Sequence, residues 1–181
     1  TSAPLSVELD SARDKAGLLH GSPIDLEGSW KVTAGHKLIS ANRPALLTTA
    51  LPYLDGQPVE ILYETEFEVT EDAARGRAVV ALDSVAGIAE LTINDVKLPT
   101  KSFDPFLFEV SGTLQAGTNE LRIKVIPPLR NSLVSSEGLM DAELQQFSDK
   151  LGGAGLQGPV KIYYLPATEV SRPTQESIII E

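Results

Sequence analysis

Residues 152–165, GGAGLQGPVKIYYL, contain the spacing G-x-G-x-x-G at Gly153, Gly155 and Gly158. In a dinucleotide-binding loop these glycines follow a strand and open a helix, whose N-terminal amides hold the pyrophosphate. Here the order is reversed, because a helix-like segment precedes the glycines and Pro159 with a strand-like run follows them. The sequence therefore predicts no NAD or nucleotide site, and it predicts that Gly155 and Gly158 are turn residues that open a strand.

Acidic side chains are abundant, and glycoside hydrolysis needs two carboxylates about 5 to 9 Å apart in a cleft. The acids with a regular pattern fall on the polar face of one predicted strand and on the polar side or cap of one predicted helix. They are Glu60, Glu64, Glu66, Glu68, Glu137, Asp141 and Glu143. Because both patterns are typical of solvated surfaces, we predict no catalytic residue among them.

Metal ligands are scarce. The two histidines, His20 and His36, stand in polar or loop-like segments without a carboxylate at metal-binding spacing. A structural calcium would need clustered carboxylates in a loop, and the pattern D-x-D-x-D-G is absent. We therefore expect no metal site and no cofactor.

Aromatic residues in loops are the remaining candidates, because a ring can stack on a sugar while amide, carboxylate and guanidinium groups bind the hydroxyls. Trp30 begins a strand-like run and is predicted to be a core residue. Tyr53 and Phe103 lie in the loop-like segments LPYLDG and KSFDPF, where anchoring of the loop is their alternative role. The candidate ligand-binding residues are Asn42, Arg43, Tyr53, Phe103, Asp104, Arg130 and Asn131.

The elements that must position these residues are mostly strands. Residues 59–69 place apolar or β-branched side chains at odd positions and glutamates between them, which predicts a half-buried antiparallel strand. Similar runs recur at 76–83, 89–94, 106–110, 119–125 and 159–165. We therefore predict an all-β fold, an antiparallel β-sandwich with short helices in its loops. Its expected core includes Trp30, Phe67, Val80, Leu91, Ile93, Leu121, Ile123 and Ile162.

The connections carry the other predicted features. Asn94 and Asp95 favour a tight hairpin turn, and Gly117 with Asn119 marks another turn. Helices are predicted at 44–51 and 140–151. The longest irregular connections are 35–58, 97–105 and 127–157. If these loops meet at one end of the sandwich, the candidate residues would surround one shallow site suited to a neutral or uronic sugar.

Composition excludes several classes of function. The chain has 181 residues and no cysteine, so it fits one domain without disulfides or thiolate metal sites. Fifteen Lys and Arg against 25 Asp and Glu give a net charge of −10, which disfavours binding to nucleic acid. No run approaches the ~20 apolar residues of a membrane span, and the first residues lack the pattern of a signal peptide.

The two ends differ from the middle. We predict an N-terminal extension or linker at 1–27, a β-sandwich module at 28–165, and a C-terminal linker or edge strand at 166–181. The segments LSVEL at 5–9 and SIIIE at 177–181 are strand-like and are expected to join sheet edges, since three consecutive isoleucines are unfavourable in water.

The order of segments GSWKV, VEILYETEFEV, AELTIND, GTNEL, NSL and GLQGPV resembles the sugar-binding, galactose-binding-like jelly roll of glycoside hydrolase family 2. It is closest to the version appended to family 106 rhamnosidase-like enzymes, over roughly residues 28–165. Asp95 replaces a glycine of the family pattern, and Ser132 replaces the arginine of its N-R-L motif. Any interface or ligand contact that this arginine makes in relatives is therefore not expected at Ser132, although Arg130 could reach similar space.

This resemblance implies a non-catalytic accessory module of a glycoside hydrolase. The module would bind carbohydrate, a neighbouring catalytic domain, or both. It also implies a secreted or periplasmic location. The alternative is a stand-alone jelly-roll enzyme, a glycosidase or a polysaccharide lyase. A lyase would need a base near an Arg or Lys pair in a groove, and the small number of His and Tyr residues disfavours it.

Overall fold

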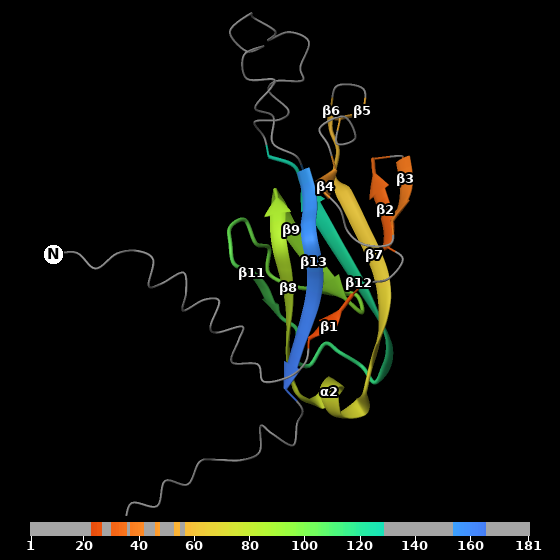
Figure 1. Cartoon of the computed structure of the whole chain (residues 1–181), viewed down its shortest axis with the longest axis vertical. Coiled ribbons are helices and arrows are strands. Elements are labelled where there is room, and N and C mark those ends of the chain that lie inside the picture. Colours follow the sequence, from red (N-terminus) through yellow and green to blue (C-terminus); the bar gives the residue numbers. More distant parts are fainter. Residues whose placement is uncertain are drawn as a thin grey trace, which may run out of the picture.

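The computed structural model describes residues 23–26, 30–35, 37–41, 46–47, 53–54, 57–128 and 154–165. Over these residues the chain forms two antiparallel sheets packed face to face, with one short helix at one end (Figure 1). The predicted all-β sandwich is therefore confirmed.

The larger sheet has six strands in the order β10-β9-β12-β7-β2-β3. Their bounds are Val96–Lys97 for β10, Ile88–Ile93 for β9, Gly117–Ile126 for β12, Ile61–Val69 for β7, Trp30–Ala34 for β2 and Lys37–Ala41 for β3. All of its pairings are antiparallel, and the long strands β7 and β12 lie side by side in its middle.

The second sheet has five strands, four of them in the order β1-β13-β8-β11. They are Ile24–Asp25, Ala154–Leu165, Arg77–Ala86 and Phe106–Glu109, and β4 at Leu46–Leu47 also pairs with β13. Strand β1 lies within the segment 1–27. A separate hairpin joins β5 at Tyr53–Leu54 to β6 at Gln57–Pro58.

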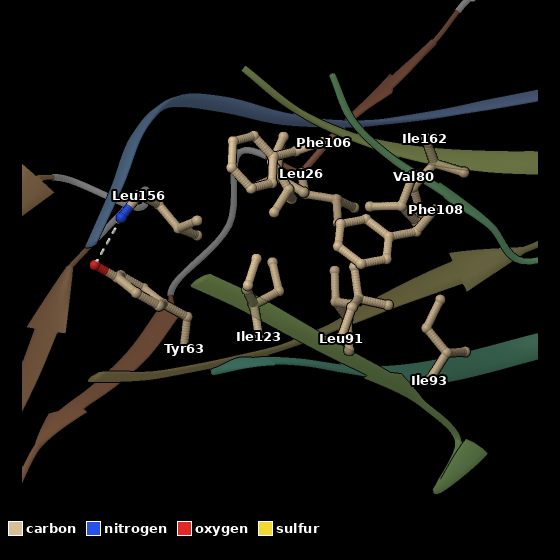
Figure 2. Packing of buried hydrophobic residues seen from close by; sticks show 14 of the residues in the cluster. Leu26, Tyr63, Val80, Leu91, Ile93, Phe106, Phe108, Ile123, Leu156 and Ile162 are labelled. Atoms are coloured by element: carbon tan, nitrogen blue, oxygen red, sulfur yellow. Dashed lines mark hydrogen bonds between the residues drawn. The ribbon is translucent and has the colours of Figure 1, made fainter. Parts of the chain in front are cut away.

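Alternation of side chains along the strands builds the core between the sheets. Along β7, the odd positions from Ile61 to Val69 are buried, while Glu66 and Glu68 are exposed. Figure 2 shows side chains of the two sheets packed against each other. All eight predicted core residues are at most 7% exposed, so this prediction is confirmed: Trp30, Phe67, Val80, Leu91, Ile93, Leu121, Ile123 and Ile162.

Trp30 is a packing residue with a satisfied polar group. Its side chain is 1% exposed, and its Nε1 donates a hydrogen bond of 3.0 Å to the backbone oxygen of Leu26. The indole ring therefore stabilises the entry of the chain into the sandwich, as the sequence predicted, rather than facing a ligand.

The hairpin predicted at Asn94 and Asp95 is confirmed, since both residues have positive φ, 47° and 65°, between β9 and β10. Asn94 also fixes the start of β12, because its Oδ1 accepts from Glu120 N at 3.0 Å and its Nδ2 donates to Asn119 Oδ1 at 2.7 Å. Asn119 is fully buried, and its carboxamide bonds the backbone of Gln115 and Gly117 at 2.7 to 2.8 Å. Gly117 and Asn119, predicted to mark a turn, therefore lie at the start of β12 instead, where the buried Asn119 amide is satisfied by the segment that precedes the strand and by the partly buried Asn94.

Gly87 joins the two sheets. It is the single residue between β8 of the five-stranded sheet and β9 of the six-stranded sheet. Its φ is +141°, and a Cβ at this position would overlap the backbone oxygen of Ile126. Glycine is therefore required where the chain crosses from one sheet to the other.

Two further local predictions were wrong. Strand β13 begins at Ala154, so Gly155 and Gly158 lie within it, at φ +115° and +84°, rather than in a turn before it. The pairing with β8 shifts between Gln157 and Val160, which makes this region a β-bulge. The second error is the helix at 44–51, because Leu46–Leu47 forms β4 and pairs with Ala154 and Gly155.

One helix was missed. Helix α2, Glu71–Arg75, begins after Thr70, whose hydroxyl oxygen accepts from Ala73 N at 3.3 Å. Acidic residues in its first turn and Arg75 in its last suit the helix dipole. The predicted helix at 140–151 and the predicted edge strands at 5–9 and 177–181 lie outside the described residues.

Candidate functional site

The strand register shows where the predicted loops leave the sandwich. Ala34 is opposite Ile61, Ile61 is opposite Val125, Val125 is opposite Ala89, and Ala89 bridges to Lys101. These five residues form one row across the six-stranded sheet, near the end where the connections after β2, before β7 and after β12 lie. Figure 1 shows the β5–β6 hairpin beyond the same end.

This row sets the spacing of the loops. Adjacent strands lie about 4.8 Å apart, so Lys101 is about 19 Å from Ala34 but only about 10 Å from Val125. The connection 97–105 therefore starts nearer to the origin of 127–157 than to Ala34. The segment 35–58, predicted as irregular, instead contains β3, β4, β5 and β6. Ala41, at the end of β3, is opposite Trp30, so the chain leaves β3 at the end of β2 that is farther from this row. Of the predicted site residues, Asn42, Arg43, Arg130 and Asn131 lie outside the described residues, and for Tyr53 only the backbone of β5 is described.

Phe103 and Asp104 stand on a loop whose base is held on both sides. Lys101 exchanges two backbone hydrogen bonds with Ala89, at 2.8 and 2.9 Å, and Leu107 N donates to Pro105 O at 2.9 Å. Between these anchors the Phe103 side chain is 83% exposed, and Asp104 is exposed beside it. An exposed ring with a neighbouring carboxylate has the chemistry needed to stack on a sugar and to bind its hydroxyls.

The carboxylates of the six-stranded sheet are paired with cations on its outer face. Lys31 Nζ lies 2.7 Å from Glu64 Oε2, and Arg122 Nε lies 2.7 Å from Glu120 Oε1. Glu60, Glu66 and Glu68 are exposed on the same side. The prediction of a solvated strand face is therefore confirmed for Glu60, Glu66 and Glu68, whereas Glu64 is only partly exposed.

The ion pairs of this face change the pKa of one carboxyl group, that of Glu90. Hydrogen bonds from Lys124 and Lys97, each with a distance of 3.0 Å, lower the pKa of Glu90 below its usual value. Contact with Glu90 in turn raises the pKa of Lys124. A glycosidase general acid needs the opposite change, a raised pKa, so the Glu90 cluster is suited to ion pairing rather than to proton donation.

Two features of the described residues concern metal and membrane binding. Among them, no group of three or more His, Cys, Asp or Glu side chains is placed to hold a metal ion. Within the same residues, no helix has the length and apolar character of a membrane-spanning helix.

Comparisons with known proteins give the following relatives. No family model matches the chain. A Formosa agariphila protein named "Putative beta-glucuronidase" is 28% identical over 128 residues, which cover 65% of this chain and 11% of that protein. The chain thus spans about a ninth of this curated relative.

Solved structures of similar fold are glycoside hydrolases. A rhamnosidase from Novosphingobium sp. PP1Y matches with a TM-score of 0.61 and 24% identity, over 79% of this chain and 15% of the enzyme. A β-D-mannosidase from Dictyoglomus thermophilum has a TM-score of 0.58 and 17% identity, over 81% of this chain and 23% of the enzyme. A β-glucuronidase from an uncultured Clostridium has a TM-score of 0.56 and 18% identity, over 81% of this chain and 29% of the enzyme. This chain therefore has the fold of a β-sandwich that makes up a minor part of several glycoside hydrolases.

Proposed function

We propose that this chain is a non-catalytic accessory module of a glycoside hydrolase. One observation carries the proposal: the solved enzymes that it resembles are glycoside hydrolases, yet it covers only 15 to 29% of the three compared above. The ion-paired carboxylates of the outer face and the lowered pKa of Glu90 support a role other than proton transfer. We place the module at residues 28–165 together with β1, whose pairing with β13 adds Ile24–Asp25 to the sheet. Its parent enzyme is rhamnosidase-like and secreted or periplasmic.

The ligand of the module is carbohydrate, bound at the loops of one end. The anchored and exposed Phe103 supports this part of the proposal, with Asp104 as the nearby acceptor for sugar hydroxyls. The remaining residues of the proposed site are Asn42, Arg43, Tyr53, Arg130 and Asn131.

The experiment is a glycan array probed with the purified 181-residue chain, with turnover of the same glycans assayed in parallel. Binding without turnover is the expected result. Turnover by the isolated chain would support the stand-alone enzyme instead. If the chain neither binds nor hydrolyses any glycan, its role in the parent enzyme is architectural and the carbohydrate site is wrong.

A further inference from the structure

The outer faces of the two sheets differ in chemistry. The outer face of the six-stranded sheet carries the ion pairs described above. In the middle of the five-stranded sheet the outward positions are instead occupied by Val79, Ala81, Leu107 and Tyr163, all partly exposed. These four side chains are named the apolar block.

The apolar block is contiguous across three strands. Tyr163 of β13 is directly opposite Val79 of β8, and Leu107 of β11 is directly opposite Ala81 of β8. Val79 and Ala81 are two positions apart on one strand and so share a face. The inward neighbours on the same strand are buried in the core: Ala78, Val80 and Leu82. Between the exposed Arg77 and Asp83, strand β8 is thus apolar on both faces, which is typical of a strand that is covered on both sides. On the outer face Glu109 is directly opposite Val79 and Lys161 directly opposite Ala81, so charged side chains border the apolar block within the same rows.

Ion pairs lie on both sides of the apolar block. Arg77 Nη2 lies 3.6 Å from Glu109 Oε2, and Lys161 Nζ lies 3.5 Å from Asp25 Oδ1. An apolar centre with a charged and exposed rim is the common arrangement of a protein interface.

The path of the chain places neighbouring segments beside this face. Ile24 of β1 pairs antiparallel with Ile162 of β13, so the residues before β1 and those after Leu165 leave the sheet at the same end. Tyr163 is two residues from that exit. Whatever is joined to the sandwich through either segment is therefore tethered to the end of the sheet nearest Tyr163.

We propose that the apolar block docks onto the adjacent domain of the same polypeptide, in the larger glycoside hydrolase of the proposed function, on which this inference rests. Each outward position of the sheet covers about 4.8 by 6.6 Å, so the four side chains give an apolar area of about 130 Å². Freely associating proteins bury about 800 Å² each. The area is small for a second copy and suits a tethered domain, whose effective concentration is about millimolar.

The test compares hydroxyl-radical labelling of Tyr163 in the isolated 181-residue chain and in the full-length protein that contains it. We expect Tyr163 to be labelled in the isolated chain and protected several-fold in the full-length protein. Leu38, 61% exposed on β3 of the other sheet, should be labelled equally in both. Hydrolysis of aryl glycosides by the full-length protein tests the proposed function separately, because it does not depend on which face docks.

A pair of matched variants measures the docking itself. Leu107→Lys adds a charge to the apolar block, and Leu62→Lys adds one to the outer face of the six-stranded sheet, where Leu62 is also partly exposed. In the full-length protein, Leu107→Lys should raise the labelling of Tyr163 to its level in the isolated chain, whereas Leu62→Lys should leave Tyr163 protected several-fold. Circular dichroism of the isolated chains checks that both variants are folded.

Each other outcome overturns the proposal. Equal labelling of Tyr163 in both proteins means that this face stays in water, and protection of Leu38 alone means that the other sheet docks. Protection of Tyr163 already in the isolated chain assigns the face to the chain's own flanking segments. A dimer of the isolated chain that Leu107→Lys dissociates assigns it to a second copy.

Discussion

The hydroxyl oxygen of Tyr63, on β7, accepts a hydrogen bond of 3.1 Å from the backbone N–H of Leu156, on β13 (Figure 2). The two residues belong to different sheets, and each is at most 1% exposed. The bond is therefore a polar link across a core formed mostly of aliphatic and aromatic side chains, close to the bulge of β13.

Replacing Tyr63 by Phe should destabilise the fold. The change keeps the ring but removes the acceptor for a buried N–H, so the free energy of unfolding should fall by about 1 to 3 kcal/mol. Urea denaturation measures the effect. Tyr163→Phe removes a hydroxyl from the outer face and should change stability by less than about 0.5 kcal/mol. Equal effects of the two substitutions would contradict the importance of the Leu156 bond.

Alkaline pH should weaken the fold through the same residue. Burial raises the pKa of Tyr63 from 10 to about 12, and the Leu156 hydrogen bond opposes this shift in part. As pH rises, Tyr63 loses its hydroxyl proton in the unfolded chain before it does so in the folded protein. The contribution of this proton to the free energy of unfolding is therefore complete below pH 10 and is lost as pH rises to about 12. The loss should reach about 2 to 3 kcal/mol. In the folded protein, tyrosinate absorbance should show one tyrosine that ionises near pH 12. This step should be absent from the Tyr63→Phe variant.

Gly158→Ala should destabilise the sandwich more than Gly112→Ala. Both glycines have positive φ, +84° and +77°, but a Cβ at Gly158 would overlap the Asp83 carboxylate, whereas nothing lies within 4 Å of a Cβ at Gly112. We expect a cost of about 1 to 2 kcal/mol at Gly112 and at least about 1 kcal/mol more at Gly158. Thermal unfolding measures both, and adding Asp83→Ala should recover part of the Gly158→Ala loss. Identical costs at the two glycines would refute the steric argument.

Asn119→Asp should lower stability by about 2 to 4 kcal/mol at neutral pH. The carboxylate has the shape of the amide, but it cannot donate to the Gln115 and Gly117 carbonyl oxygens, and its charge is buried. Gln115→Ala serves as control, because the two hydrogen bonds of Gln115 with Asn119 use the backbone N and O of Gln115. Chemical denaturation should leave the control within about 0.5 kcal/mol of wild type. A tolerated aspartate would show that the amide network is dispensable.

Phe103→Ala should weaken glycan binding by about 1 to 3 kcal/mol if the ring stacks on the sugar, and it should leave the fold intact because the side chain is 83% exposed. Calorimetry with the glycan selected on the array measures this. Leu38→Ala removes another exposed apolar side chain, from β3, and should leave the affinity unchanged. An unaltered affinity in Phe103→Ala would remove Phe103 from the site.

The strands were predictable where the local pattern alone determines burial. Residues 61–69 alternate regularly, and the structure follows that alternation along β7. Pairing between distant segments was not predictable in the same way. The segment 44–51 has a helical pattern by itself, but its Leu46 and Leu47 pair with Gly155 and Ala154, more than a hundred residues away. The sequence predicts an unusual backbone at Gly155 and Gly158 but assigns it to a turn. A turn and a bulge both favour glycine because both need positive φ, so the sequence alone does not distinguish them.

The candidate site was less predictable than the fold. The segment KSFDPF identified an exposed ring, but only the register that joins Lys101 to Ala89 shows which end of the sheet the loop approaches. The apolar block was missed because the run AVVAL at 78–82 was interpreted by period two alone. A continuous apolar run is also the pattern of a strand covered on both faces, and this signal was present in the sequence.

The position of β13 between β1 and β8 has a consequence for biosynthesis. Strand β13 is the last described strand along the chain, yet it is the partner of the first one and of the long strand β8. While the polypeptide emerges from the ribosome, the six-stranded sheet has all its strands once Ile126 is available, but the five-stranded sheet must wait for Leu165. A nascent or truncated chain that ends before Ala154 would leave β1 without this partner and β8 with an open edge, which makes it a ready substrate for chaperones and proteases.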